Sequence, residues 1–246
     1  MMTTRDYYQI RKRRSLLGES LQSLSISDIL ASDDAVHIQN EFHSIDAEDS
    51  VRELCGVLDR LDIDYISVVD PDEGNLVAVL GDMDVLHLLA QLAQRHPTVF
   101  SSSIESLSLV NLVPPPTIST SSLLSEVIPM MCDRNISTVP VVDNNNRVVG
   151  LYNFSDTSFI TKLSPNSDVS VLSSIDNQTI GEILEIQHEG NPHPPTCQAK
   201  DSIKFVLEQM VALRVTKLVY IDQNAVCLGI IRARDIFNFI LPEQTP

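Results

Sequence analysis

The fold is decided by the stretch STVPVVDNNNRVVGLY, residues 137–152. Its two apolar halves flank three asparagines, a pattern typical of a buried strand, a tight turn and a second strand that pairs back on the first. A helix is expected next, because Asn153 is a good N-cap and Asp156 follows it by three residues. The stretch therefore predicts a strand–strand–helix unit.

The same unit occurs three times in the chain. The first copy has predicted strands at 65–70 and 76–80, and the third has them at 217–222 and 226–231. Each turn begins with an aspartate, and each following helix starts with another one. The turn aspartates are Asp70, Asp143 and Asp222, and the helix aspartates are Asp84, Asp156 and Asp235. Self-similarity at a near-constant period decides the architecture.

An amphipathic helix is predicted before each hairpin, because apolar residues recur there at i, i+3, i+4 and i+7. These residues are Val51, Leu54, Cys55, Leu58 and Leu61 in the first copy, Leu124, Val127, Ile128 and Met131 in the second, and Ile203, Val206, Leu207, Met210 and Val211 in the third. With a short extended lead-in, each unit is β-α-β-β-α, so the predicted class is α/β (α+β). Pro129 requires the second helix to accommodate a kink.

The unit resembles the CBS domain, the regulatory module named after cystathionine beta-synthase, over roughly residues 36–243. The sequences VVDPDEGN (68–75), ISTVPVVD (136–143) and ARDI (233–236) are further similar to the last three of four CBS units in the gamma subunit of AMP-activated protein kinase. The stretch SLSL, residues 106–109, lies where that family has a linker between units.

This resemblance implies that units two and three pack sheet to sheet as a pseudo-twofold pair. Unit one would then lack a partner, and we expect its apolar surface to be covered by the N-terminal segment, by homodimerisation or by another subunit. The predicted segments are a basic tail (1–25), unit one (26–97), a Ser/Pro linker (98–117), unit two (118–165), a loop (166–178) and unit three (179–246). Leu86, Leu89 and Leu92 should line the buried side of the last helix of unit one.

Composition excludes several classes of function. A net charge of −16 argues against non-specific nucleic-acid binding, and no apolar run approaches the ~18 residues of a membrane span. No signal peptide is visible, so we expect a cytoplasmic protein. The basic run RKRRS, residues 11–15, is open to three interpretations: a nuclear-localisation patch, a basophilic kinase site or a solvated tail.

No constellation for catalysis or metal binding stands out. The four cysteines, Cys55, Cys132, Cys197 and Cys227, have no CxxC spacing and are expected to be buried thiols. The six histidines have no zinc-ligand spacing, and GxSxG, HExxH and P-loop patterns are missing from the sequence. We therefore expect a protein that is not an enzyme and has no metal and no prosthetic group.

The resemblance implies that the helix aspartates, Asp84, Asp156 and Asp235, hold the ribose of an adenine nucleotide. A carboxylate near a helix N-terminus can accept hydrogen bonds from both ribose hydroxyls, and the helix end favours phosphate. The alternative is that each aspartate only caps its own helix. By resemblance, Ser137 lies with Thr120 and Ser121 across the cleft from Asp235 and leaves room for adenine.

The expected phosphate side departs from the family. Where the gamma family has a His-Arg pair at the strand start of its second and fourth units, this chain has Asp64-Tyr65 and Thr216-Lys217. Lys217 keeps one positive charge, whereas Asp64 would repel a phosphate. Arg232 and Arg234, at the start of the last helix, either bind phosphate or neutralise an acidic surface. One predicted pocket thus contains Asp235, Arg232, Arg234 and Ser137, and another contains Asp156 with Lys217.

These observations favour a non-catalytic regulatory subunit that binds AMP, ADP or ATP. Its partners by resemblance are a kinase catalytic subunit and a scaffolding beta-type subunit, or it forms a homodimer. One alternative is a degenerate CBS scaffold, marked by Asp64 and Tyr65, that has lost nucleotide binding. Another is a homodimeric sensor of an adenosyl ligand unrelated to kinases. The sequence leaves open which nucleotide binds and how many sites are filled.

Overall fold

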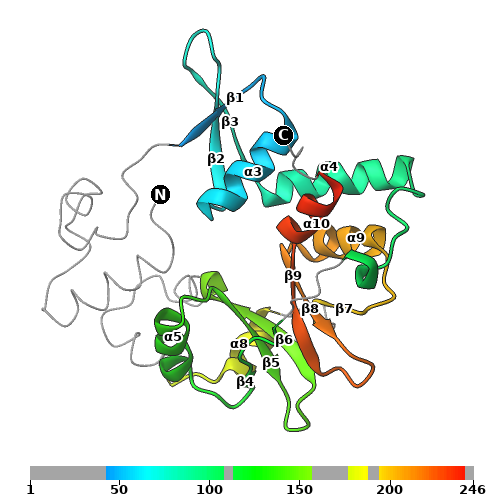
Figure 1. The fold of residues 1–246 in the computed structure, drawn as a ribbon. Helices are drawn as coiled ribbons and strands as arrows, with labels where there is room; N and C mark the ends of the chain where they lie inside the picture. Colours follow the sequence, from blue (N-terminus) through cyan, green and yellow to red (C-terminus); the bar gives the residue numbers. More distant parts are fainter. Residues whose placement is uncertain (1–42, 108–112, 157–176, 188–193, 242–246) are drawn as a thin grey trace, which may run out of the picture. The chain divides into compact units, whose positions relative to one another are not determined.

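The computed structural model describes residues 43–107, 113–156, 177–187 and 194–241. They form three sheets of three strands each, in the orders β1-β2-β3, β4-β5-β6 and β7-β8-β9 (Figure 1). The predicted α/β class and the three repeats are confirmed. The basic tail, the run 11–15, residues 108–109 of the stretch 106–109, and most of the loop 166–178 lie outside the described residues.

The first repeat has the predicted β-α-β-β-α order. Its elements are β1 (Ser44–Asp46), α3 (Val51–Leu61), β2 (Tyr65–Val69), β3 (Leu76–Gly81) and α4 (Asp82–Arg95). Strand β1 is the expected lead-in and runs parallel to β2, whereas β3 is antiparallel to β2.

The third repeat has the same order and register. Its elements are β7 (Thr196–Cys197), α9 (Ile203–Leu213), β8 (Lys217–Ile221), β9 (Cys227–Arg232) and α10 (Ala233–Ile240). In both repeats the register of the hairpin shifts just before the last residue of its first strand. The two hairpins can therefore be compared residue by residue.

The second repeat comprises β4 (Ile118–Ser119), α5 (Leu124–Asp133), β5 (Thr138–Val142) and β6 (Val148–Asn153). The helix predicted after Asn153 begins as a short 3₁₀ helix, Phe154–Asp156, and its continuation lies outside the described residues. Helix α8 (Ile180–Gln187) follows further along the chain; its Gly181 N–H donates to the Thr120 carbonyl at 2.8 Å.

The helical periodicity correctly identified the buried faces. All four predicted residues of α5 are buried, and the helix continues through Pro129. Helices α3 and α9 bury most of their predicted residues: Leu54, Cys55 and Leu58 in α3, and Ile203, Val206, Leu207 and Met210 in α9. Leu86 and Leu89 of α4 are buried, and Leu92 packs against the same core.

The turn aspartates hold each hairpin turn closed. In every repeat the Oδ1 atom accepts two backbone N–H groups, as in an Asx turn. The donors are Asp72 and Glu73 for Asp70 (2.9 and 3.0 Å), Asn145 and Arg147 for Asp143 (2.8 and 2.9 Å), and Asn224 and Val226 for Asp222 (2.8 and 2.8 Å). Two residues before the second strand, the backbone is left-handed at Gly74 (φ 68°), Asn146 (φ 60°) and Ala225 (φ 62°).

The chain divides into two compact bodies. The first body contains 117–141 and the described part of 152–192. The second body contains the described parts of 43–116 and 193–246 together with 142–151, the tip of the second repeat's hairpin. The first and third repeats therefore belong to one body, and most of the second repeat belongs to the other.

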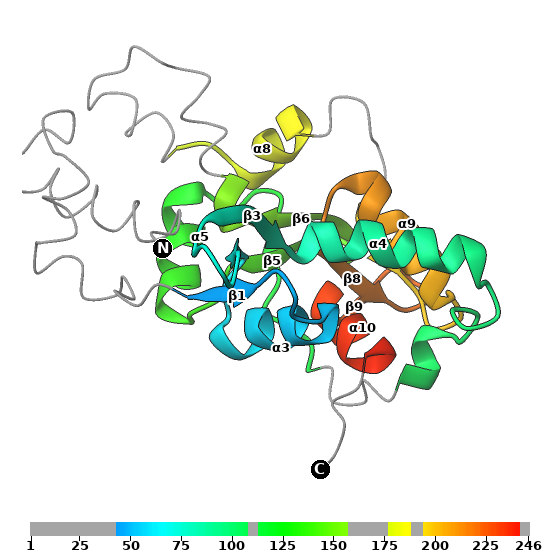
Figure 2. The same ribbon diagram turned by 90° about the horizontal axis from the view of Figure 1, so that it is seen from above.

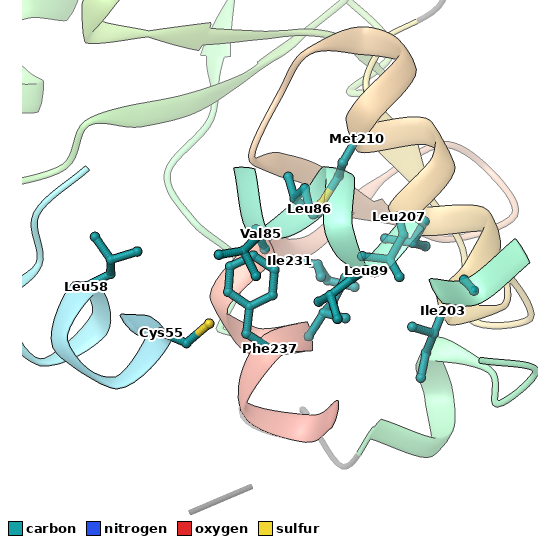
Figure 3. Packing of buried hydrophobic residues seen from close by; sticks show 14 of the residues in the cluster. Cys55, Leu58, Val85, Leu86, Leu89, Ile203, Leu207, Met210, Ile231 and Phe237 are labelled. Carbon is teal, nitrogen blue, oxygen red and sulfur yellow. The ribbon is translucent and has the colours of Figure 1, made fainter. Parts of the chain in front are cut away.

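The core of the second body is shared by the helices of the first and third repeats (Figure 2). Helix α4 packs against α9, and α10 packs against both α3 and α4. Figure 3 shows Phe237 of α10 beside Val85 of α4, with Leu86 and Met210 nearby. The helical side of the first repeat is thus covered within the chain, whereas the expected lack of a partner concerns the outer face of its sheet.

A second cluster lies on the opposite, outer face of the third repeat's sheet. Val219, Ile221 and Cys227 are buried there against Val142, Val148 and Leu151 of the second repeat's hairpin tip. The Val148 N–H donates to the Ala225 carbonyl at 2.8 Å, which links the two hairpins directly. The expected contact between the sheets of units two and three is present at this tip.

Candidate functional site

The three helix aspartates have the same local role. In each repeat the Oδ2 atom accepts the backbone N–H of the residue three positions earlier, the N-cap position of the following helix. The distances are 2.9 Å from Gly81 to Asp84, 2.7 Å from Asn153 to Asp156 and 2.8 Å from Arg232 to Asp235. Each carboxylate is thereby fixed at a helix start, which is the geometry of the capping alternative.

The side chains beside these aspartates differ between repeats. The first residue of the hairpin pairs with its last, so that Tyr65 faces Gly81 in the first repeat and Lys217 faces Arg232 in the third. A Cβ at Gly81 would lie 2.7 Å from the Tyr65 ring, so this ring occupies the space beside the Asp84 helix start. The first repeat thus has an aromatic ring where the third has two cations.

Arg232 and Asp235 form an ion pair at the start of α10. The guanidinium Nη2 and Nε donate to Asp235 Oδ1 at 2.7 and 3.2 Å. This hydrogen bond, helped by the negative charge, raises the pKa of Arg232 above its usual value. The Arg232 side chain is 49% exposed, and such exposed pairs contribute only about 0–1 kcal/mol. A competing anion could therefore displace Asp235 from Arg232 at little cost.

Arg234 points the other way and joins the third repeat to the first. Its Nε donates to Asp82 at 3.0 Å, its Nη1 to Asp62 at 3.3 Å and its Nη2 to the Ile63 carbonyl at 2.6 Å. The Arg234 side chain is only 7% exposed. Arg234 is therefore a buried bridge, and sequence reasoning missed this role because its partners lie more than 150 residues earlier in the chain.

Burial also affects the charged groups around this bridge. It raises the pKa of Asp82, although the Arg234 charge acts in the opposite direction. It lowers the pKa of Lys217, while Asp64 and Asp62 favour the charged ammonium. The Asp64 carboxylate, expected to repel phosphate, thus supports the charge of Lys217.

The remaining predicted residues are divided between the two bodies. The first body contains Thr120, Ser121, Ser137 and Asp156. The second body contains Thr216 and the three predicted cationic residues, Lys217, Arg232 and Arg234. Ser121 Oγ lies 2.9 Å from Ser119 Oγ, and the Ser137 carbonyl accepts the Phe154 N–H at 2.8 Å. The Thr216 carbonyl accepts the Ala233 N–H at the start of α10, also at 2.8 Å. The predicted cleft between Ser137 and Asp235 stays a prediction.

The other side chains singled out in the sequence have structural roles where they can be followed. None of the four cysteines forms a disulfide bond, and Cys55, Cys197 and Cys227 are buried, as expected. Within the described ranges there is no cluster of three potential metal ligands. The same ranges contain no helix that is long and apolar enough to cross a membrane.

Comparisons with known proteins agree with this architecture. The CBS domain family matches residues 110–156 and 177–242. The gamma subunit of 5'-AMP-activated protein kinase from Dictyostelium discoideum is 26% identical over 209 residues, covering 81% of this chain and 35% of the relative. The human gamma-3 subunit is 24% identical over 201 residues, covering 80% of this chain and 40% of the relative. The chain thus spans well under half the length of these relatives.

Two solved structures share the fold. A Methanocaldococcus jannaschii protein, described as a candidate archaeal homolog of the kinase gamma subunit, superposes with a TM-score of 0.68 at 17% identity, covering 96% of this chain and 81% of its own. An uncharacterised conserved protein from Pyrococcus horikoshii gives 0.59 at 16% identity, covering 85% and 84%. The repeats, the family match and these relatives together lead to one conclusion: residues 110–156 and 177–242 match the CBS domain family, and the chain resembles the gamma subunits of AMP-activated protein kinase.

Proposed function

We propose that this protein is a non-catalytic regulatory subunit that binds an adenine nucleotide and regulates a protein kinase complex of the AMP-activated type. The similarity to gamma subunits over about four fifths of the chain supports a nucleotide-binding regulatory role. AMP, ADP and ATP are the proposed ligands, and a kinase catalytic subunit with a beta-type subunit are the proposed partners.

The observation that carries the proposal is the matched placement of Asp84, Asp156 and Asp235. Each is locked at a helix start through Oδ2, so its orientation is set before any ligand arrives. Pre-organised acceptors lose little conformational entropy on binding. A ribose with two neighbouring hydroxyls is a suitable donor for such a carboxylate.

The third repeat is the best candidate for phosphate recognition. Arg232 and Lys217 are paired across the hairpin and flank the N-terminus of α10. A guanidinium, an ammonium and a helix N-terminus all favour a phosphate. In the proposed site of the third repeat Asp235 binds the ribose, and Arg232 and Lys217 bind phosphate. The sequence-based expectations that Ser137, Thr120 and Ser121 lie at the base, and that Asp156 and Lys217 share another pocket, stay predictions.

One observation favours a second candidate function, that of a scaffold without nucleotide. Arg234, expected at the phosphate, is buried in its bridge to Asp82, and both oxygens of Asp235 already accept hydrogen bonds. These groups satisfy one another without a ligand. On this alternative the chain regulates its partners through protein contacts alone.

Calorimetric titration with AMP, ADP and ATP separates the two functions, with Asp235→Ala as the test variant. Because this change also removes a helix cap, Glu53→Ala is the matched control: Glu53 accepts the Ser50 N–H at 2.9 Å at the start of α3, a helix that contains none of the proposed ligand groups. Each change should lower stability by about 1 kcal/mol. We expect binding to be lost in Asp235→Ala and kept in Glu53→Ala.

Thermal unfolding gives an independent reading of the same question. A nucleotide at about 100 times its Kd stabilises the native state by about 2.7 kcal/mol. For a chain of this length that is a rise in Tm of roughly 5–10 °C. A wild-type protein that shows neither heat nor a Tm shift with any of the three nucleotides would favour the scaffold. Co-purification with a kinase catalytic subunit tests the proposed partner in either case.

A further inference from the structure

The outer face of the first repeat's hairpin is apolar and open to solvent. Val79 and Tyr65 lie on this face and are 51% and 49% exposed, and Leu76 and Val77 on the same hairpin are 62% and 59% exposed. The opposite face of the sheet is already used, since Ile66 and Val68 are buried in the core shared with the third repeat. An apolar surface of this kind on a sheet is typical of an interaction site.

The same face is covered in the other two repeats, and by one another. The fifth residue of the first strand and the first residue of the second strand are Val142 and Val148 in the second repeat, and Ile221 and Cys227 in the third. These four side chains are buried together in one cluster. Equivalent residues thus meet equivalent residues, which is the arrangement produced by a twofold axis.

In the first repeat, Val69 and Leu76 occupy these two positions. Leu76 is 62% exposed, whereas its counterparts Cys227 and Val148 are only 8% and 5% exposed. The hairpin register is the same as in the third repeat, including its irregularity before the last residue of the first strand. The open face therefore has the geometry of a half-interface whose other half is a hairpin like itself.

From this correspondence we infer that the outer face of the first repeat's hairpin binds the same face of a second copy of this chain, forming a twofold dimer through Val79 and Leu76. A second copy presents an identical face, so the contact closes on itself and covers both faces. The packing of the second on the third repeat shows that two such faces are complementary in shape within this chain.

Charge at the hairpin tip sets the conditions under which the dimer forms. Asp72 and Glu73 are exposed in the turn of the first repeat. The residues that correspond to Asp72 are Asn144 and Gln223, and those that correspond to Glu73 are Asn145 and Asn224, so the other two turns are uncharged at both positions. Two copies would bring these acidic turns toward each other. Because salt screens repulsion between exposed charges, the dimer should be tighter at about 0.5 M than at about 0.05 M NaCl.

Sedimentation velocity of the full chain without nucleotide tests this inference, over about 1 to about 100 μM. The variant Val79→Lys places a charge on the face, and because Val79 is exposed the fold should not change. Leu228→Lys is the matched control, since Leu228 is an exposed apolar residue on the second strand of the third repeat's hairpin. Circular dichroism and Tm verify that both variants fold.

We expect a wild-type dimer whose Kd rises by about tenfold or more in Val79→Lys and is unchanged in Leu228→Lys. A wild-type chain that stays monomeric at all of these protein concentrations would overturn the inference. The face would then be covered by something other than a second copy, such as residues 1–42 or another protein. A dimer that Val79→Lys leaves intact would also overturn it, because its interface would lie elsewhere. Neither outcome depends on nucleotide binding.

Discussion

The hairpins of the first and third repeats have strands of the same lengths, the same strand register and a turn closed by an aspartate, yet their outer faces have opposite environments. Val219 of the third repeat is completely buried, whereas Val79 of the first is 51% exposed. Local sequence therefore determines the hairpin, and the rest of the chain determines whether its face is covered. Four experiments test this difference between the two repeats.

The largest effect is expected where the two repeats are joined, at Arg234→Ala. This change leaves Asp82, whose side chain is 13% exposed, without its cation in the buried core. Removing one partner of a buried ion pair typically costs 3–5 kcal/mol, so we expect a loss of about that size in the free energy of unfolding, measured with urea. Arg232→Ala is the control and should cost about 0–1 kcal/mol, since its side chain is 49% exposed. Equal losses in the two variants would show that the bridge does not hold the repeats together.

A pair of identical substitutions compares the two outer faces directly. Val219→Ala removes two buried methyl groups and should lower the free energy of unfolding by about 2 kcal/mol. Val79→Ala removes the same atoms from an exposed position and should change it by no more than about 0.5 kcal/mol in dilute protein. Urea unfolding at low concentration provides both values. A loss at Val79 as large as at Val219 would mean that the first face is covered in the monomer.

Alkaline pH should weaken both repeats through their buried thiols. Burial raises the pKa of Cys55 in the first repeat and of Cys197 in the third to about 12. Above pH 9.0, the ordinary pKa of the thiol, the unfolded chain releases a proton that the folded chain keeps, so stability falls as pH rises. Between pH 9 and about pH 10 each thiol should cost roughly 1 kcal/mol. Cys55→Ala and Cys197→Ala should each remove that part of the slope, and an unchanged slope in either would contradict the assignment.

The smallest effect is expected in the turns. Ala225 has a left-handed backbone, with φ of 62°, at the position where the first repeat has Gly74 with φ of 68°. Glycine adopts this conformation without the strain of a Cβ, so Ala225→Gly should stabilise by about 0.5–1 kcal/mol and Gly74→Ala should destabilise by about 1 kcal/mol. Differential scanning calorimetry should register opposite shifts in Tm of about 2–4 °C. Shifts of the same sign would exclude backbone strain as the cause.

Local features of the fold were predictable because their causes lie within a few residues of one another. The spacing of Leu124, Val127, Ile128 and Met131 was enough to identify the buried face of α5. The turn aspartates and the capping positions were likewise visible, since an Asx turn and an N-cap each involve residues two to four apart.

The contacts between repeats were not predictable in the same way. Each repeat has two apolar surfaces, one on its helices and one on the outer face of its hairpin. The sequence analysis paired only the second and third repeats and left the first without a partner. The third repeat has two, since α9 and α10 pack on the first repeat and β8 and β9 pack on the second. Arg234 illustrates the limit, because nothing near it in the sequence distinguishes a partner at Asp82 from a phosphate.

The core shared by the first and third repeats also has a consequence during protein synthesis. Leu86 of α4 and Leu207 of α9 belong to one core but are about 120 residues apart, with the second repeat between them. At the usual translation speed of about 5–20 residues per second, α9 is completed roughly 6–24 s after α4. During this interval the part of α4 that packs on α9 lacks that partner on the nascent chain, and a ribosome-associated chaperone could bind it there. The first repeat is made early and acquires its native helical partner last.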